Sequence, residues 1–433
     1  MKKTFNILTL GCKVNQYESE AIEELFINRG FEKKEDHADI YVINTCTVTN
    51  MSDRKSRQTI SRARKENPNA VIAVMGCYSQ VKPEEVKKID GVDIILGSRN
   101  KEDVVSLCED FFQDKKQIDD VISLSETKTI EELQIENQSE MTRAYIKIQD
   151  GCNMYCSYCM IPYARGDISS RDMDSIVGEA KRLADNGFKE IVLTGIHVSS
   201  YGKEKELEEK SDLIEVIENV AKVDGIERIR LSSMEPRHIT RDFLERVKAT
   251  GKACDHFHLS LQSGSDHVLD LMNRKYDTKI YKEKVDLIRE VFANAGLTTD
   301  IIVGFPQETE EDHRDTLDFI KDIEFSKIHV FKYSKRTGTK AAAMTGQIDG
   351  NIKKERSHDV SSLEEEIRKN FLEKQVGKTL SVLFETKSDM EGFMSGYSTN
   401  YLRVNVKNDV EDNEIRDVLI KEVKNDELIG ELV

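Results

Sequence analysis

The chain has 433 residues, a formal net charge of −16 and 33% charged side chains. Its length predicts about three domains at roughly 150 residues each, and its acidic balance has the wrong sign for phosphate binding, so charge alone favours a small-molecule enzyme over a nucleic-acid-binding protein. There is no apolar run of about 18 residues and no signal-peptide cleavage pattern, which predicts a cytoplasmic protein without a membrane segment. The 8 cysteines favour metal or catalytic roles over disulfides in such a chain.

Residues 1–112 alternate between strand and helix patterns. Three apolar runs are each followed by a charged, helix-like segment, and a fourth run follows them: 5–11, 39–45, 70–76 and 92–97. This pattern predicts βαβ units and an open parallel sheet. Cys12, Cys46 and Cys77 each directly follow one of the first three runs. Because the carboxyl ends of parallel strands lie along one ligand-binding edge, we expect these thiols to meet there; three separately buried thiols are the alternative.

The next segment, 113–141, is charged and contains no Gly, Pro or aromatic residue. We interpret it as a connecting segment rather than core, with a short helix at 129–135. The strand–helix alternation resumes over 142–350. Its candidate strands are 143–149, 189–195, 228–233, 256–262, 298–304 and 327–333. Six such strands predict a partial (β/α)6 barrel with its active site at the strand carboxyl ends.

A second group of cysteines follows the first strand of this barrel. Cys152, Cys156 and Cys159 form a C-x3-C-x2-C pattern, with no histidine or further cysteine between residues 160 and 179. Iron–sulfur clusters are normally held by four cysteines, so three thiolates would leave one iron open to a ligand or substrate, as in catalytic zinc sites. A zinc site short of a ligand, or three unrelated core thiols, are the alternatives. Cys108 is expected in the core of an amphipathic helix.

The C-terminal part changes pattern again. We expect a helix with a serine N-cap over 351–374, and then short alternating strands over 375–433 that predict a small antiparallel β-barrel. Phe393, Tyr397 and Tyr401 are either RNA-stacking residues or barrel core, and core is the favoured interpretation. The barrel is more acidic than basic. An RNA-binding surface would therefore be formed by a basic helix of the first domain, with Arg54, Lys55, Arg57, Arg62, Arg64 and Lys65. The alternative interpretation is that these residues form an ordinary solvent-exposed helix face.

Three blocks of this sequence together resemble the radical S-adenosylmethionine (radical-SAM) methylthiotransferases over essentially the whole chain. They are TLGCKVNQYES with NTCTVT and VMGCYSQ, then GCNMYCSYCMIPYARG, and a terminal barrel similar to a TRAM domain. Tyr158 matches the aromatic position before the third cysteine of the radical-SAM signature. The resemblance implies two 4Fe–4S clusters, with Cys152, Cys156 and Cys159 holding the one that activates SAM. Cys12, Cys46 and Cys77 would hold an auxiliary cluster that delivers sulfur.

The resemblance also implies a reaction and a partner. Such enzymes add a methylthio group to an unactivated C–H bond, chemistry that the cofactors carry while the protein positions the substrate. TLGCKVNQYES resembles the threonylcarbamoyladenosine enzymes, whereas isopentenyladenosine enzymes typically read TYGCQMN there. The implied target is C2 of N6-threonylcarbamoyladenosine beside the anticodon of tRNA. Its carboxylate requires a cation, for which Arg165 or Arg237 is our candidate. Flavodoxin or ferredoxin is the implied type of electron donor.

Further SAM contacts are expected at strand ends. Arg171 is the candidate bidentate partner of the SAM carboxylate. By the resemblance, Thr194 and Gly195 occupy the place where this superfamily binds the SAM amino group, and Tyr158 is a cofactor-binding candidate from the signature itself. The strand-end candidates either bind SAM or cap a helix or turn: Thr194, Gly195, Ser232, Glu235, Gln262 and Gly304. His197 is a weaker candidate for the cavity, while His256 and His258 favour packing.

Three other functions remain open at this point. In the first, the target is an isopentenyladenosine of tRNA. In the second, it is a ribosomal protein, for which the related enzymes typically read SLGCPKN. In the third, the chain is a cluster-carrying redox or scaffold protein without SAM chemistry. Cleavage of SAM eliminates the third function, and a substrate assay separates the others.

Overall fold

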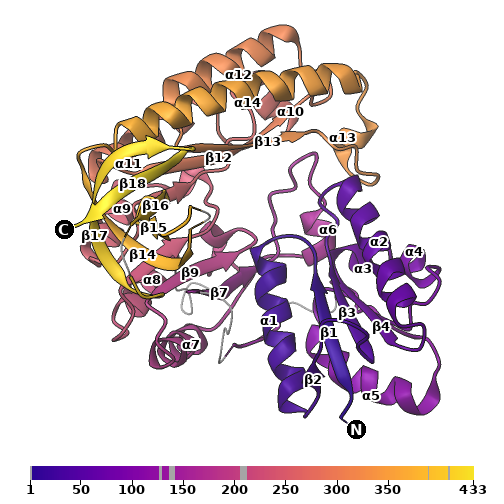
Figure 1. Cartoon of the computed structure of the whole chain (residues 1–433). Coiled ribbons are helices and arrows are strands. Elements are labelled where there is room, and N and C mark those ends of the chain that lie inside the picture. The colour runs from indigo at the N-terminus through magenta and orange to yellow at the C-terminus, as the bar shows by residue number, and fades with distance from the viewer. Residues whose placement is uncertain (1, 126–128, 136–141, 205–211, 389, 408–409) are drawn as a thin grey trace.

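The computed structural model describes residues 2–433 except 126–128, 136–141, 205–211, 389 and 408–409. Three parts follow one another along the chain: an α/β sheet domain, a strand–helix domain and a β-barrel (Figure 1). This is the predicted fold class. No helix of the described part of the chain is long and apolar enough to cross a bilayer.

The first part is an open sheet of six parallel strands in the order β2-β1-β3-β4-β5-β6. The strands are β1 (Thr4–Thr9), β2 (Glu32–Lys33), β3 (Ile40–Thr45), β4 (Val71–Gly76), β5 (Ile94–Leu96) and β6 (Ile118–Asp120). The helices are α1 (Lys13–Asn28), α2 (Asn50–Glu66), α3 (Cys77–Val81), α4 (Pro83–Lys87), η1 (Lys101–Asp103) and α5 (Val104–Asp114). β3 is buried on both faces, because Ile40 and Val42 join one apolar cluster while Tyr41 and Ile43 join another.

Part of the expected connecting segment, 113–141, belongs to the sheet and to the apolar core, so the prediction of a segment outside the core was wrong for that part. β6 completes the first sheet, and residues 129–135 form neither the predicted helix nor a strand. Leu133 and Ile135 are buried in the cluster that also contains Tyr145 of the next domain. Leu133 and Ile135, two apolar residues of this charge-rich segment, therefore pack at the junction between the two domains. The Glu131 carboxylate lies 3.0 Å from the Lys101 ammonium, which explains one of those charges.

The second part contains the six predicted strands, arranged in two sheets of order β8-β7-β9-β10 and β11-β12-β13. All pairs are parallel except that of the short β8. The strands are β7 (Arg143–Asp150), β8 (Ser169–Ser170), β9 (Glu190–Gly195), β10 (Arg228–Leu231), β11 (His256–His258), β12 (Gly296–Val303) and β13 (Lys327–Lys332). Parallel bridges Ile229↔Ala253 and Met234↔Leu259 connect the two sheets. β11 is shorter than predicted, and side-chain hydroxyls bond the backbone beyond it: the Tyr276 hydroxyl donates to the Leu261 carbonyl, 2.9 Å away, and the Leu261 N–H donates to the Thr299 hydroxyl at 3.0 Å.

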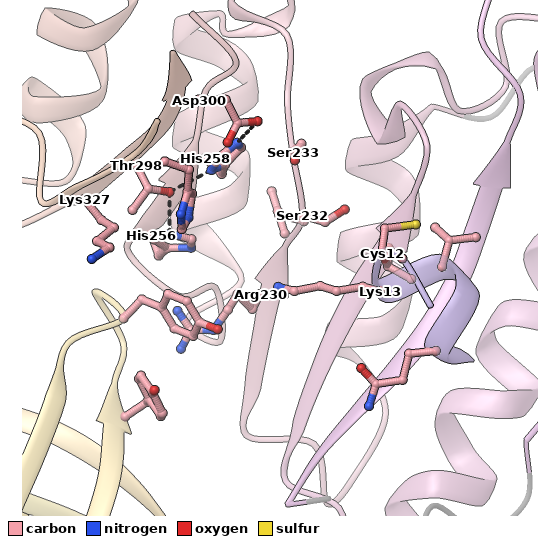
Figure 2. Close-up of a pocket in the computed structure, with 18 of the residues that line it drawn as sticks. Cys12, Lys13, Arg230, Ser232, Ser233, His256, His258, Thr298, Asp300 and Lys327 are labelled. Carbon is pink, nitrogen blue, oxygen red and sulfur yellow. Dashed lines mark hydrogen bonds and ion pairs between the residues drawn. The ribbon is translucent and has the colours of Figure 1, made fainter. Parts of the chain in front are cut away.

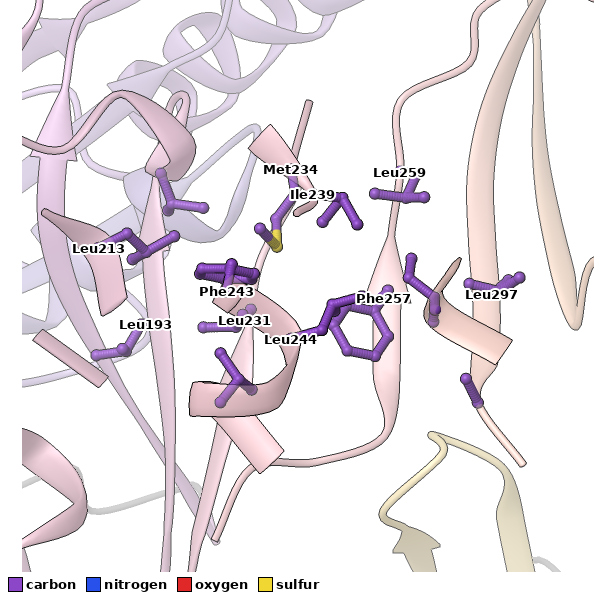
Figure 3. Packing of buried hydrophobic residues seen from close by; sticks show 14 of the residues in the cluster. Leu193, Leu213, Leu231, Met234, Ile239, Phe243, Leu244, Phe257, Leu259 and Leu297 are labelled. Atoms are coloured by element: carbon purple, nitrogen blue, oxygen red, sulfur yellow. The ribbon is translucent and has the colours of Figure 1, made fainter. Parts of the chain in front are cut away.

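Helices alternate with these strands along the chain. They are α6 (Ile161–Arg165), α7 (Met173–Asp185), η2 (Val198–Ser200), α8 (Leu213–Ala221), η3 (Pro236–His238), α9 (Arg241–Ala249), α10 (Asp266–Leu271), α11 (Thr278–Val291), α12 (Glu310–Ile323) and α13 (Lys340–Ala343). Helices α7, α8, α9, α11 and α12 pack against the strands in one apolar cluster. Leu231 and Phe257, on adjacent strands, pack against Phe243 and Leu244 of α9 in this cluster, which is the largest (Figure 3). The core therefore lies between strands and helices, which leaves the inner strand face and strand ends for a site.

The third part is helix α14 (Gly350–Glu373) and a closed barrel in the order β14-β15-β16-β18-β17. The strands are β14 (Thr379–Lys387), β15 (Met394–Ser398), β16 (Arg403–Val406), β17 (Ile415–Lys424) and β18 (Glu427–Leu432). The barrel is not wholly antiparallel, because β16 pairs with β18 in parallel. The predicted serine N-cap is also wrong. α14 begins at Gly350, before any serine of this segment, and the Asp349 side chain caps it by accepting from the Asn351 backbone N–H.

Candidate active site

A cavity of about 1330 Å³ lies where the three parts meet. Its wall includes Cys12 and Lys13 at the start of α1, the ends of β9 and β10, and Tyr397 and Tyr401 of the barrel. Figure 2 shows Cys12 and Lys13 facing Ser232 and Arg230 across this space. Thr194 and Gly195, predicted from the family resemblance, and Ser232, predicted from its strand end, are on the cavity wall.

Cys12, Cys46 and Cys77 converge at one edge of the first sheet. β3 lies between β1 and β4, with Thr9 opposite Asn44 and Thr45 opposite Gly76, so the three strands end side by side. A Cβ atom on Gly11 would lie 3.3 Å from the Cys46 Sγ, and the backbone there has a φ of 119°, so glycine permits this close approach. Burial raises the pKa of Cys77 to about 11; Arg165 opposes this shift, and the neighbouring Cys46 and Cys12 thiols add to it. The three thiols therefore form one group.

Cys152, Cys156 and Cys159 form a second group in the loop after β7. Burial raises the pKa of Cys159 to about 12, and the Cys156 and Cys152 thiols contribute to the shift. The Ile161 backbone N–H donates to the Cys159 Sγ at 3.4 Å. The signature residue Tyr158 packs edge-on against Phe305, with ring centroids 6.3 Å apart, behind this loop.

Each thiol group receives a hydrogen bond from an arginine, buried in the case of Arg165 and half-buried in the case of Arg274. The Arg165 Nε donates to the Cys77 Sγ at 3.3 Å, and the Arg274 Nη1 donates to the Cys156 Sγ at 3.2 Å. Three clustered thiols with a cationic donor fit an iron–sulfur cluster, because thiolates are its ligands and hydrogen bonds to sulfur adjust its potential. Cys108, by contrast, is fully buried in the apolar core of the first domain, as predicted.

Arg165 was predicted to bind a substrate carboxylate, and its surroundings contradict that role. It is fully buried, and its Nη1 lies 2.5 Å from Glu18 of α1 and 3.1 Å from Asp150. Lys101 and Lys147 complete this group of buried charges. Arg165 therefore connects the second thiol loop to the first thiol group and has no donor facing the cavity. A buried charge without such partners would be strongly destabilising.

Arg171 was predicted to bind the SAM carboxylate, and this too is wrong. Its guanidinium is fully buried and donates to the Glu179 carboxylate at 2.5 Å and to the Tyr17 hydroxyl at 3.1 Å. Tyr17 belongs to α1, so this pair fastens the first domain to the second. Arg171 does bind a carboxylate, but that carboxylate is internal, and the contact is through Nη1 alone rather than bidentate, because Nη2 donates to the Ser175 hydroxyl.

Replacing Arg171 by Met is therefore expected to destabilise the fold. Glu179 would keep its buried charge without a cation, a loss of about 3–5 kcal/mol in typical cases. We expect a clearly lower urea midpoint by circular dichroism; the midpoint is used because a multidomain chain does not unfold in two states. Arg182→Met is the matched control, since Arg182 contacts the Gln134 side chain at an exposed position. Equal midpoints in the two variants would contradict the role given to Arg171.

Glu235 and Arg237 pair with each other beside the second thiol loop. The Arg237 Nε lies 2.6 Å from the Glu235 carboxylate, and its Nη2 approaches the Met154 sulfur at 3.8 Å. Burial would raise the pKa of Glu235, but hydrogen bonds from His238 and Arg237 lower it to about 2. Arg237 does not line the central cavity. It is therefore not placed to hold a carboxylate there.

Ligand atoms of His197, Glu235 and His238 lie within 4.8 Å of one another, the arrangement expected of a metal site. The Lys203 ammonium approaches the His238 Nε2 at 2.6 Å, and Arg237 already neutralises Glu235. We therefore interpret the group as a hydrogen-bonded network. Burial lowers the pKa of His197 to about 4, which makes it a neutral ring.

Gln262 and Gly304 were predicted at strand ends, but Gln262 lies four residues beyond β11, and neither residue lines the cavity. Gln262 has a φ of 75° beside its bridge to Ile301. The Gly304 N–H donates to the Glu308 carboxylate at 2.9 Å. The structure assigns both residues a role in turn geometry, and their contact with SAM stays a prediction.

The barrel tyrosines are not core, contrary to the favoured interpretation. Tyr397 and Tyr401 stack with ring centroids 5.0 Å apart and line the cavity. His256, expected to serve in packing, lies 4.7 Å from Tyr401 between ring centroids, and both His256 and His258 also line the cavity. The Thr298 hydroxyl bonds both imidazoles.

Two of the six basic residues expected on the RNA surface are used internally. Arg57 pairs with Glu85 at 3.0 Å, and Arg64 pairs with Asp93 at 2.6 Å. The other four are exposed on α2: Arg54, Lys55, Arg62 and Lys65. The helix keeps a basic outer face, smaller than predicted.

Sequence reasoning missed Lys13, Arg143, Arg230 and Arg274. Arg143 and Arg230 lie within strands, and a charged residue inside a strand of a buried parallel sheet is itself a signal of a polar function. Lys13 directly follows Cys12, so its place at the site could have been inferred from that neighbour.

Sequence comparisons match all three parts of the chain. Residues 146–320 match the radical SAM superfamily, residues 4–97 match Uncharacterized protein family UPF0004, and residues 373–433 match the TRAM domain. The fold also resembles the radical S-adenosylmethionine methyltransferase TsrM from Kitasatospora setae. Its TM-score is 0.56 at 14% identity, over 77% of this chain and 75% of that one. Fold and site together define a radical-SAM enzyme with a second three-cysteine site.

Relatives define the family more closely. The chain is 41% identical to a protein of Bacillus subtilis named threonylcarbamoyladenosine tRNA methylthiotransferase MtaB, over 92% of this chain and 88% of that protein. It is 36% identical to a protein of Pelotomaculum thermopropionicum named tRNA-2-methylthio-N(6)-dimethylallyladenosine synthase, over 91% and 89%. The chain belongs to the radical-SAM methylthiotransferase family. Membership supports SAM and an iron–sulfur cluster as its cofactors.

Proposed function

We propose that this chain is a tRNA methylthiotransferase that adds a methylthio group to C2 of N6-threonylcarbamoyladenosine next to the anticodon. The observation that carries the proposal is the presence of two three-cysteine groups beside one cavity, which Cys12 of the first group and Ile161, two residues after Cys159, both line. Arg165, at the end of the helix that follows the second thiol loop, donates to Cys77 of the first group. The MtaB relative, similar over most of both chains, supports the substrate. We place the reaction in the cytoplasm, where tRNA and reduced thiols occur together.

In this proposal Cys152, Cys156 and Cys159 hold the 4Fe–4S cluster that binds SAM, and Cys12, Cys46 and Cys77 hold a second one. When bound, the first cluster supplies an electron and an open iron for SAM, and the second supplies sulfur. Arg274 and Arg165 donate to a sulfur of each group and limit the negative charge there. Thr194, Gly195 and Ser232 are the proposed SAM contacts on the wall, and a flavodoxin or ferredoxin is the proposed donor.

The cavity suits a nucleoside. Its volume of about 1330 Å³ exceeds the roughly 300–1,000 Å³ of ordinary small-molecule sites, so it has room for a modified base together with SAM. An anticodon-loop base can be splayed out of single-stranded RNA and enclosed, whereas a duplex base must first be flipped. The stacked Tyr397 and Tyr401 offer a flat aromatic surface to such a base.

Deleting the gene tests the substrate. We expect mass spectrometry of tRNA nucleosides to show loss of the 2-methylthio form of threonylcarbamoyladenosine, with the unmodified threonylcarbamoyladenosine accumulating. Re-expression of the wild-type chain should restore the product. The second candidate target is isopentenyladenosine, favoured by relatives of the synthase group at 36% identity. Loss of its methylthio derivative instead would show that this second candidate is correct.

A further inference from the structure

Lys13 is a cation on the cavity wall that has no ion pair or hydrogen bond within the described part of the chain. Its contacts are with aromatic rings: the ammonium lies 5.7 Å from the Tyr145 ring centroid and 5.8 Å from that of Tyr401. Figure 2 shows its side chain reaching across the cavity toward Arg230. A cation placed in this way is available to a ligand.

The other lysines and arginines on the cavity wall are already engaged. Arg230 is typical: its Nε lies 2.7 Å from Glu190, and it also donates to barrel carbonyls. The remaining pairs are Lys33 with Glu23, Lys327 with Glu364, Arg368 with Asp426 and Arg403 with Glu427. Lys13 is therefore the candidate for recognising a new anion.

The charges around Lys13 favour an anion. Arg143 pairs with Glu385 at 2.6 Å, and Arg228 and Arg230 share Glu190 at 3.7 and 2.7 Å. Asp255 also interacts with Arg230 and Arg228, so four cations, Lys13 included, face three carboxylates. Glu20, also on the wall, lies seven residues along α1, about 10 Å at 1.5 Å per residue. An added carboxylate would improve the balance at this end of the cavity.

We propose that Lys13 binds the carboxylate of the N6-threonylcarbamoyl group and so selects this base over one with an uncharged N6 substituent. The inference rests on the proposed function and names the residue that determines its substrate. C2 and N6 share one edge of adenine, so the group that recognises the N6 substituent must lie close to the group that delivers sulfur. Lys13 directly follows Cys12 in the sequence, so the two side chains begin from adjacent backbone positions. An isopentenyl group would desolvate the ammonium without giving it a partner, which is unfavourable.

Two RNA substrates test this with the wild-type protein. One is an anticodon stem-loop that carries threonylcarbamoyladenosine; the other is the same RNA with the threonine carboxylate converted to a carboxamide. Both kcat/KM for methylthiolation and Kd by fluorescence anisotropy are measured at one salt concentration. We expect the carboxylate RNA to be preferred by about 10- to 100-fold, the range for a hydrogen bond between charged groups.

Variants assign the preference to Lys13. Lys13→Gln should abolish the preference, bringing the two RNAs to nearly equal Kd. Lys327→Gln is the matched control, because Lys327 lines the same cavity but lies 3.6 Å from Glu364, and it should keep the preference.

Several outcomes would overturn the inference. One is equal kcat/KM and equal Kd for the two RNAs with the wild type, a result that needs no variant. The others are a carboxylate preference that is unchanged in Lys13→Gln, or one that is lost equally in Lys327→Gln. Failure of the proposed function is distinguishable, since the wild type would then modify an isopentenyladenosine RNA and leave both threonylcarbamoyl RNAs untouched.

Discussion

Alanine at Cys152, Cys156 or Cys159 is expected to abolish the reductive cleavage of SAM to deoxyadenosine. Each thiol is one of three in a group that offers no spare ligand, and a cluster held by two thiolates is not expected to persist. The measurement is deoxyadenosine formation by reconstituted protein with dithionite, followed by chromatography. Iron content should fall by about four per chain in each variant, because one cluster is lost.

Cys108→Ala and Cys254→Ala are the matched controls. Both thiols are buried, and Cys108 lies in α5 among apolar side chains. They should keep iron and SAM cleavage while showing the mild destabilisation of a smaller core side chain. Deoxyadenosine formation retained in any variant of the first three would refute the radical-SAM ligand assignment. Loss of cleavage in the controls would show that the assay reports stability instead.

Local patterns predicted the parts of the site that depend on local chain geometry. Cys12, Cys46 and Cys77 were predicted together because each directly follows an apolar run, and parallel strands end at a common edge. Ser232, which lies on the cavity wall, was predicted by the same argument. The rule needs only strand positions, which alternating sequence patterns supply.

Residues whose partners lie far along the chain were not predictable in this way. Arg165 bonds Glu18, which is 147 residues away, so no pattern near Arg165 shows that its charge is neutralised. An exposed Arg165 that binds a substrate carboxylate was therefore equally consistent with the sequence. Leu133 and Ile135 were hidden among charges, and only their packing against the first sheet shows that they are core.

The barrel shows a second limit. Alternation predicts strands but does not say which face meets another domain. Tyr401 adopts a φ of 68° after β15 and points toward Arg230, whose guanidinium carbon lies 4.6 Å from the Tyr401 ring centroid. That contact exists because the barrel closes the cavity of the second domain. The tyrosines were therefore assigned to the wrong environment, although their aromatic character had been noted as functional.

Replacing Cys12, Cys46 and Cys77 together by alanine is expected to separate SAM cleavage from sulfur transfer. Reconstituted wild type should hold about eight irons per chain and the triple variant about four, since each three-thiol group would hold one 4Fe–4S cluster. The triple variant should still form deoxyadenosine, because Cys152, Cys156 and Cys159 lie in a different loop and domain. It should form no methylthio product from threonylcarbamoyladenosine RNA.

The decisive comparison is iron content against product in the same preparation. Arg165 donates to Cys77, so removal of the thiols leaves the Arg165 Nε without that acceptor while its Glu18 and Asp150 contacts remain. Those contacts should keep the domain junction intact, which near-wild-type circular dichroism would show. Full iron content with methylthio product in the triple variant would mean that the first thiol group is structural. Four irons, active SAM cleavage and no product would instead assign sulfur delivery to the edge of the first sheet, directly beside Lys13.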